Sequence, residues 1–404
     1  MMSTSTSTID PNRTLPDHET TDDVSLVRYD LPFRWQRRIG LIPRGGGLGV
    51  GRRALFLTAL AWLPVAVRAG WAGRALPEQT QTVEPLLEHF GVHARLLFGI
   101  PLLIVAEAVA QQVTTRLIPQ FVHAGIVPPE DLPRFRAILA RMVRLRNAVL
   151  PWVVIAALAL TSAAVHRGHE LSWASESGPT PSFGFGGWWY VYVGRPIFLA
   201  LLLGWFWRLI LLTTTLKRIA KLRLVMVPTH PDRAGGLGFV ERFPAAFSLV
   251  VFALAAVIAA GWAHDAEFHG LDVHSLYPMM AAGLAVALVF FLSPLLVFVG
   301  PLRRAKRQAL LDYGALVVRH GASVRSKWIL GETKGDDPLL SAPEIGPVAD
   351  TVSLYEAVSR MRPVPLGKAA VLAIALPILI PFLGVLALQI PVKDLLLQLA
   401  KGLL

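Results

Sequence analysis

Glu107 is the only acidic residue within the long apolar stretches of this 404-residue chain. A charged side chain in the hydrocarbon of a bilayer costs several kcal/mol, so a carboxylate there is a candidate functional group. Arg195 stands in another apolar stretch, and at about 1.5 Å of rise per residue an arginine side chain can bridge their difference in depth. The two residues therefore suggest an ion or substrate pathway, with a structural ion pair as the alternative. Arg208 is expected to extend its charge toward the membrane surface.

A second group of candidates lies in Gly-rich connections. His230, Asp232 and Arg233 stand at the start of one Gly-rich segment, and Arg44 stands at the start of a similar one. Backbone N–H groups of such a turn before a helix can bind phosphate, so these residues are candidate ligands for an anion or a lipid headgroup. The spacing fits neither the Walker pattern nor the dinucleotide fingerprint. The alternative is a tight turn in which Asp232 caps the chain locally.

Histidines gather in the connections that carry few cations. Imidazole and carboxylate groups at this density can bind zinc or another divalent ion. Their spacing matches no metal motif, so we assign no metal ligand and take solvated polar loops as the alternative. The chain has no cysteine and no evident nucleophile–base arrangement, so we predict no catalytic residue, no cofactor and no enzymatic activity. The histidines and acids concerned are His89, His93, His166, His169, His264, His269, His274, Asp265, Glu267 and Asp272.

The elements that must position these residues are long apolar helices. Hydrophobic residues make up 54% of the chain and charged residues 16%, with a mean hydropathy of +0.53. A soluble domain carries about 25% charged residues, so this composition argues against a soluble enzyme. Runs of about 20 apolar residues cross a bilayer as helices. We therefore predict an all-α polytopic membrane protein with seven transmembrane helices, at residues 54–73, 96–113, 147–165, 188–213, 245–263, 278–300 and 367–391.

The distribution of Lys and Arg predicts the orientation of these spans. Cytoplasmic connections of membrane proteins are enriched in both residues. Four alternate segments hold 30 of them and the three intervening connections hold four, so we predict a cytoplasmic N-terminus. The net charge of +12 then reflects this asymmetry, and the expected partner is the lipid bilayer and not nucleic acid. The rich segments are 1–53, 114–146, 214–244 and 301–366, and the poor ones are 68–95, 166–187 and 264–277.

An internal repeat suggests how the spans are organised. Residues 44–53 match residues 233–242 at six of ten positions, and each copy precedes a span that ends in Ala-Gly-Trp-Ala. We predict two parallel three-helix repeats joined by the fourth span, a 3+1+3 arrangement, with chance similarity of Gly- and Ala-rich sequence as the alternative. The predicted units are a disordered cytoplasmic tail (1–43), the first repeat (44–165), a linker unit (166–232), the second repeat (233–391) with a cytoplasmic insertion (301–366), and an amphipathic C-terminal tail (392–404).

Two motifs carry a resemblance to known proteins. They are His-Pro-Asp-Arg-x-Gly-Gly-Leu-Gly-Phe at 230–239 and Ser-Arg-Met-Arg-Pro-Val-Pro at 359–365, and a Pro-rich last span follows them. Together they resemble a family of uncharacterised bacterial multi-pass inner-membrane proteins over about residues 215–400. The resemblance implies a bacterial inner-membrane location. It implies no activity or substrate.

These observations favour a transporter or channel for a small solute or ion, because the repeat and the proline-interrupted spans accompany an intramembrane carboxylate. The alternative is a membrane sensor or scaffold that acts through 301–366, which is expected to extend the sixth helix or lie on the inner leaflet. A third alternative is an enzyme acting on lipid or phosphate at the inner face, for which no nucleophile–base arrangement is found. A homo-oligomer is left open.

Overall fold

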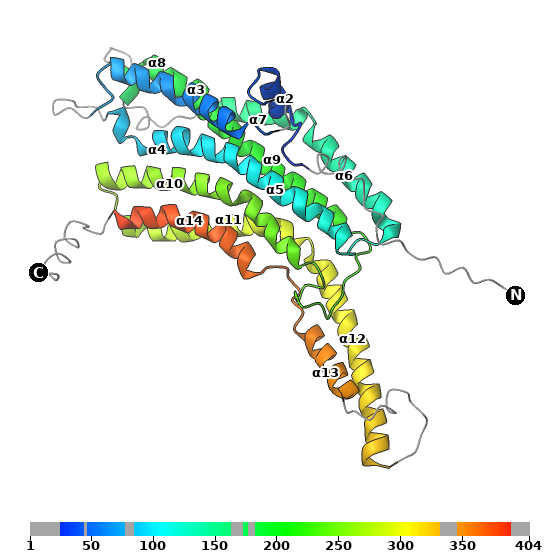
Figure 1. The fold of residues 1–404 in the computed structure, drawn as a ribbon. Helices are drawn as coiled ribbons and strands as arrows, with labels where there is room; N and C mark the ends of the chain where they lie inside the picture. Colours follow the sequence, from blue (N-terminus) through cyan, green and yellow to red (C-terminus); the bar gives the residue numbers. More distant parts are fainter. Residues whose placement is uncertain are drawn as a thin grey trace, which may run out of the picture.

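The fold is a bundle of helices that run side by side, with the chain reversing direction at each connection (Figure 1). Seven helical segments in the described part of the chain are long and apolar enough to cross a membrane. This confirms the predicted all-α, multi-pass class, whereas the 3+1+3 arrangement stays a prediction. The structure is a computed structural model, and it describes residues 25–43, 47–76, 85–162, 173–176, 182–331 and 346–388.

Most of the spanning segments combine several helical pieces, which makes them longer than the sequence predicts. Two of the seven are single helices: the first is α3 (Val50–Trp71) and the seventh is α14 (Lys368–Ala387). The second joins α4 (Phe90–His93), η2 (Ala94–Gly99) and α5 (Ile100–His123); the third joins η3 (Pro129–Asp131), α6 (Leu132–Arg146) and α7 (Leu150–Thr161); and the fourth joins α8 (Phe185–Trp189), η6 (Tyr190–Gly194) and α9 (Arg195–Ile219). The fifth joins η7 (Gly238–Phe247) and α10 (Ser248–Phe268), and the sixth joins η8 (Val273–Leu276) and α11 (Tyr277–Leu296). Short pieces outside them are η1 (Leu86–Glu88) and the two-residue antiparallel strands β1 (Ser175–Glu176) and β2 (Ser182–Phe183).

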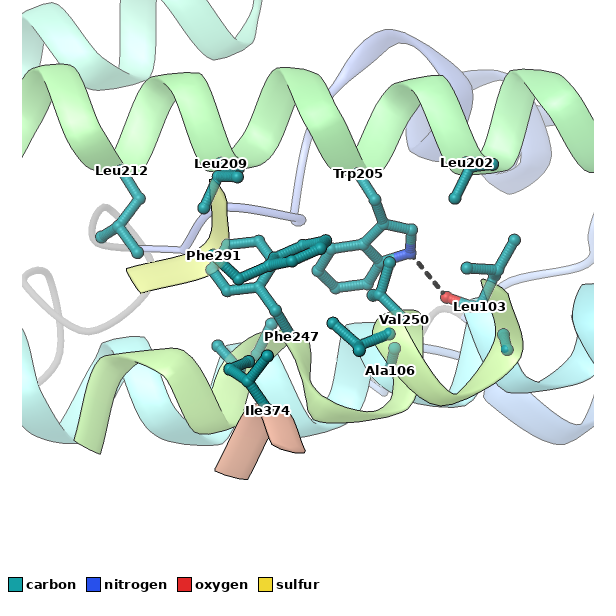
Figure 2. Packing of buried hydrophobic residues seen from close by; sticks show 14 of the residues in the cluster. Leu103, Ala106, Leu202, Trp205, Leu209, Leu212, Phe247, Val250, Phe291 and Ile374 are labelled. Carbon is teal, nitrogen blue, oxygen red and sulfur yellow. Dashed lines mark hydrogen bonds between the residues drawn. The ribbon is translucent and has the colours of Figure 1, made fainter. Parts of the chain in front are cut away.

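The centre of the bundle is a dry aromatic core around Trp205 (Figure 2). The indole Nε1 of this α9 residue donates a hydrogen bond to the Leu103 carbonyl of α5 over 2.9 Å. Its ring lies edge-to-face with Phe247, which in turn packs against Phe291. A buried indole N–H needs an acceptor, and here it finds one on the neighbouring helix. We call this cluster the tryptophan core.

Both helices that meet at the tryptophan core contain a π-helical turn near their N-terminal ends. These turns, η2 and η6, each directly precede a helix with proline in its first turn, Pro101 in α5 and Pro196 in α9. Proline lacks an N–H group and crowds the preceding turn, and a π turn is one way to accommodate it. Gly99 also brings the two helices close together, because a Cβ there would lie 2.6 Å from the Phe198 ring.

Residues 25–43 of the N-terminal segment are folded against the bundle, so the prediction of disorder is wrong for this part. The short helix α2 (Leu31–Arg38) begins at Asp30, whose side chain caps it by accepting a hydrogen bond from the Phe33 N–H over 2.9 Å. Leu26 and Val27 just before it are fully buried. The prediction relied on the polar composition of the segment and overlooked this local cap. Residues 1–24 of the predicted tail, like the C-terminal tail 392–404, lie outside the described residues.

A helical arm leaves the bundle after α11. Helix α12 (Val299–Val324) continues well beyond the ends of the other helices, ends in the π turn η9 (Arg325–Ile329), and packs along α13 (Gly346–Ser359) (Figure 1). The Lys306 ammonium fixes its base by donating to the carbonyls of Ser359 and Met361 over 2.8 and 2.6 Å. The arm matches the expected extension of the sixth helix.

Candidate functional site

Glu107 is buried in α5, and its carboxylate contacts two arginines from two other helices. Its Oε2 accepts a hydrogen bond from Arg53 at the start of α3, and its Oε1 accepts one from Nη2 of Arg208 in α9 over 2.9 Å. These contacts correct the suggested pairing with Arg195. That residue begins α9, thirteen positions and about 20 Å of helix from Arg208.

The prediction that Arg208 extends to the membrane surface is also wrong. Its side chain is only 5% exposed, because two carboxylates compensate its charge inside the protein. One is Glu107 and the other is Asp30, which accepts from Arg208 Nη2 over 2.9 Å. The guanidinium also lies over the Trp205 ring, 4.9 Å from its centroid. Burial without such partners would be strongly destabilising.

Helix α2 completes the cluster from the end of the bundle where α3 begins. Asp30, at its N-terminus, pairs with Arg208, and Gln36 accepts a hydrogen bond from Arg53 Nε. The pKa of the Asp30 carboxyl is raised, mainly because the group is buried, and the neighbouring Arg208 charge only partly offsets this effect. Two cations and two acids thus meet between three spanning segments and α2. Of this network, the sequence analysis had proposed only Glu107 as a member of an intramembrane site.

The charged cluster forms one wall of a cavity of about 430 Å³. We call this space the arginine cavity. Its polar wall consists of Gln36, Arg53, Glu107 and Arg208. The remaining walls come from α2, α3, α7 and α9 and are mostly apolar; they include Leu57, Trp152, Ile155 and Leu201. A cavity with apolar walls and a few convergent polar groups is the usual form of a small-molecule site.

Two residues that line the arginine cavity each have a buried donor without a hydrogen-bond partner in the part of the chain that the structure describes. The donors are the indole Nε1 of Trp152 and the Nε of Arg208. A buried donor without a partner costs about 1–3 kcal/mol, so each such group calls for an explanation. Gly204 of α9 lets the Trp152 ring approach, since a Cβ there would lie 3.1 Å from it.

The Gly-rich segment near Asp232 forms a self-capped turn. The Asp232 carboxylate accepts hydrogen bonds from the N–H groups of Ala234, Gly236 and Gly238, over 2.8, 3.2 and 2.7 Å. Burial alone would raise the pKa of Asp232, but these backbone donors together lower it. The N–H groups that could have bound a phosphate therefore already bind Asp232, as the local-turn alternative expects. His230 pairs with the same carboxylate at 2.9 Å.

Arg233 lies at the surface, and the turn that contains it is fixed to the second motif. The N–H of Arg362 donates to the Arg233 carbonyl over 2.7 Å, and its guanidinium pairs with Glu241 at 2.7 Å. The two segments that carry the family resemblance therefore touch each other. The structure brings none of His230, Asp232 and Arg233 to the arginine cavity. Arg44, the fourth headgroup candidate, lies outside the described residues.

A second cavity, of about 620 Å³, lies at the opposite end of the bundle. Its lining includes Arg95 of η2 and Tyr190 of η6, which hydrogen-bond to each other. Four further lining residues are His89, His264, Asp265 and His269, and we call the space the histidine cavity. Burial, then the neighbouring histidines, lowers the pKa of His89 to about 4.

The remaining histidines singled out in the sequence lie elsewhere. His93 accepts from Trp62 through Nδ1 and contacts the Leu86 carbonyl through Nε2. His274 is exposed and pairs with Asp272 at 3.0 Å. His166 and His169 are outside the described residues.

The sequence singled out Arg53 only as a possible ligand for phosphate or a lipid headgroup and did not connect it with Glu107, and it gave no indication of Asp30 and Gln36. Arg53 had a signal, because it ends a Gly-rich segment and directly precedes a predicted span. The other two lie in a segment that its composition marked as disordered. The suggested bacterial family stays an expectation for this chain. No protein-family model, curated protein or solved structure matches the chain.

Proposed function

We propose that the protein is a membrane transporter for a small amphipathic anion, with the arginine cavity as its binding site. The observation that carries the proposal is the position of Glu107. This intramembrane carboxylate is buried in an ion-pair network, and it lines a cavity together with two arginines. A purely structural ion pair gains nothing from an adjoining space of about 430 Å³.

The chemistry of the cavity favours an anion with an apolar body. Its acceptor oxygens would pair with the guanidinium groups of Arg53 and Arg208, and its apolar part would lie against Leu57 and Ile155. In the substrate-free protein Glu107 and Asp30 balance the two guanidinium charges. A bound anion would replace one of these carboxylates, most simply Asp30, because it belongs to the peripheral helix α2. Protonation of the displaced carboxylate would couple the exchange to a proton.

Two cavities on one helix pair support movement across the bundle. The histidine cavity is lined by residues of η2 and η6, at one end of the α5 and α9 segments, and the arginine cavity is lined by α5 and α9 farther along. The tryptophan core packs the same two helices together alongside the arginine cavity (Figure 2). Two spaces at different levels of one helix pair suit alternating access, and the π turns of the same two segments are sites where helices change shape.

The proposal includes a bacterial inner-membrane location with the N-terminus in the cytoplasm. The Lys- and Arg-rich connections support it, and α2 then covers the arginine cavity from the cytoplasmic side. A homo-oligomer is compatible with this function.

Uptake into proteoliposomes tests the proposal. The purified chain is reconstituted and supplied with labelled butyrate, hexanoate and benzoate, with glucose as a neutral comparison. We expect uptake of at least one carboxylate above that of empty liposomes. The variants Arg208→Lys and Arg53→Lys should lower uptake about tenfold or more, because each removes a guanidinium that would bind the charged ligand. The matched control Arg242→Gln changes an exposed arginine and should leave uptake unchanged. No carboxylate uptake, or equal uptake by all variants, would overturn the proposal.

The helical arm supports a second candidate, a sensor or scaffold. Helices α12 and α13 project from the bundle as a paired unit that a partner protein could bind. Deleting residues 310–357 separates the two candidates. A transporter should keep its carboxylate uptake, whereas a sensor or scaffold should lose the binding of its partner protein.

A further inference from the structure

We propose that His264, Asp265 and His269 form a binding site for one divalent metal ion of the Zn²⁺ class at the histidine cavity. One ligand atom from each of these residues lies within 4.8 Å of the other two. Two imidazoles and one carboxylate are a ligand set that proteins use for zinc and related ions. The small contraction needed to reach metal–ligand distances of about 2.1 Å involves two exposed side chains at the end of a helix.

The orientation of His264 favours a ligand role. Its Nδ1 lies 2.8 Å from the Glu88 carbonyl oxygen, which can only accept, so Nδ1 carries the proton. The neutral ring then offers its Nε2 lone pair, which we assign as the ligand atom. Metal-binding histidines commonly donate their other ring N–H to a backbone carbonyl, which fixes the tautomer and the ring plane. The side chain is only 9% exposed, so the ring is already held in place.

The surroundings suit a site with an open coordination position. All three residues line the histidine cavity, whose volume of about 620 Å³ leaves room for water or an anion as a fourth ligand. Arg95, which also lines the cavity, donates a hydrogen bond to the Tyr190 hydroxyl. The connection 264–277 contains no Lys or Arg and three acids, so its charge favours a cation. Three protein ligands with one open position are typical of zinc sites that exchange a ligand.

The sequence offers a matched control within the same connection. His274 pairs with Asp272 at 3.0 Å, and both side chains are about two-thirds exposed. This pair has the same residue types as the proposed site but no third ligand within reach in the described part of the chain.

Calorimetric titration of Zn²⁺ into the full-length, tag-free protein in detergent tests the site. We expect one equivalent to bind the wild type. Loss of a ligand should weaken binding at least about tenfold in His264→Gln, Asp265→Asn and His269→Gln, whereas His274→Gln binds as the wild type does. Asp265 and His269 are exposed, so their variants should keep the wild-type elution volume in size exclusion.

Two results would overturn the proposal. One is the absence of saturable Zn²⁺ binding to the wild type. The other is an equal loss of affinity in His274→Gln and His269→Gln, which would indicate adventitious surface binding. The readout is metal binding, so it stands independently of whether the protein transports an anion.

Discussion

The two Gly-rich segments have similar sequences, but their arginines lie in opposite environments. Arg53 and Arg242 end the matched segments at equivalent positions. The first is 1% exposed and bonded to Glu107, whereas the second is exposed. In the second segment the preceding Glu241 makes the ion pair instead, with Arg362.

The difference follows from what packs against each segment. In the first segment α3 already begins at Val50, and α5 and α2 present an acid and an amide to Arg53. In the second segment the ten-residue 3-10 helix η7 begins at Gly238 and precedes α10, and segment 359–367 supplies a cation. A repeated motif can therefore mark the start of a span in both halves, while the groups on neighbouring helices decide whether its arginine is buried.

The largest effect is expected for Glu107→Gln, which tests this asymmetry. It leaves two buried guanidiniums with one carboxylate, and breaking a buried ion pair from one side costs about 3–5 kcal/mol. We expect a clear fall in the midpoint of thermal unfolding in detergent. Glu356→Gln is the control, because Glu356 pairs with Arg360 at the surface and its loss should cost less than about 1 kcal/mol. Equal effects would mean that the buried network does not hold the first half together.

A double-mutant cycle sharpens the same point. Arg53→Gln alone should destabilise the protein by about 2–4 kcal/mol, because Glu107 then loses a buried partner. Adding Glu107→Gln should cost less than the sum of the two single changes, with a coupling of about 1–3 kcal/mol. The free energies of unfolding of all four proteins give the coupling. Strict additivity would contradict a direct interaction.

The turn around Asp232 provides a smaller and pH-dependent effect. Asp232→Ala leaves three backbone N–H groups without their acceptor and should cost about 1–3 kcal/mol at neutral pH. Because the pKa of Asp232 is lowered in the folded protein, its contribution is complete above the ordinary value of 3.8 and is lost as the pH falls below it. We therefore measure the unfolding midpoints of wild type and variant at pH 7 and at pH 3.5. The difference between the two proteins should be smaller at pH 3.5. A constant difference would show that the charge of Asp232 does not matter.

The smallest effect is expected for Arg242→Gln. An exposed side chain away from any cap or network changes stability by at most about 0.5 kcal/mol. The unfolding midpoint should stay at the wild-type value, in contrast to that of Arg53→Gln. A loss comparable to that of Arg53→Gln would remove the asymmetry on which the comparison rests.

The fold was predictable from the sequence because long apolar runs have few alternatives to spanning helices. The boundaries were less accurate, since several segments continue through polar residues outside the bilayer-length window. The second span was expected to cover residues 96–113, but the segment runs from Phe90 to His123. Because the depth of Glu107 was counted from residue 96, this error placed Glu107 too close to that end of the span and favoured Arg195 as its partner.

The composition of the binding site was harder to predict. Arg208 and Arg53 look like ordinary flanking cations, and only the packing of α5 between them shows that they share one carboxylate. Asp30 belongs to a segment whose composition is polar, and its role depends on a cap and an ion pair with a residue 178 positions away. His264, Asp265 and His269 are close in sequence, yet their orientation depends on the Glu88 carbonyl of another segment. Such contacts between distant residues leave no pattern in a single sequence.

The arm formed by α12 has a mechanical consequence. Lys306 ties its base to the chain just before α14, and about 27 Å of helix extend from Lys306 to Val324. A rigid rod of that length amplifies rotation: a tilt of α11 by about 10°, if α12 follows it, displaces the far end by about 5 Å. Small angular changes within the bundle would thus become displacements comparable to the pitch of a helix at the end of the arm, where a label or a bound protein could report them.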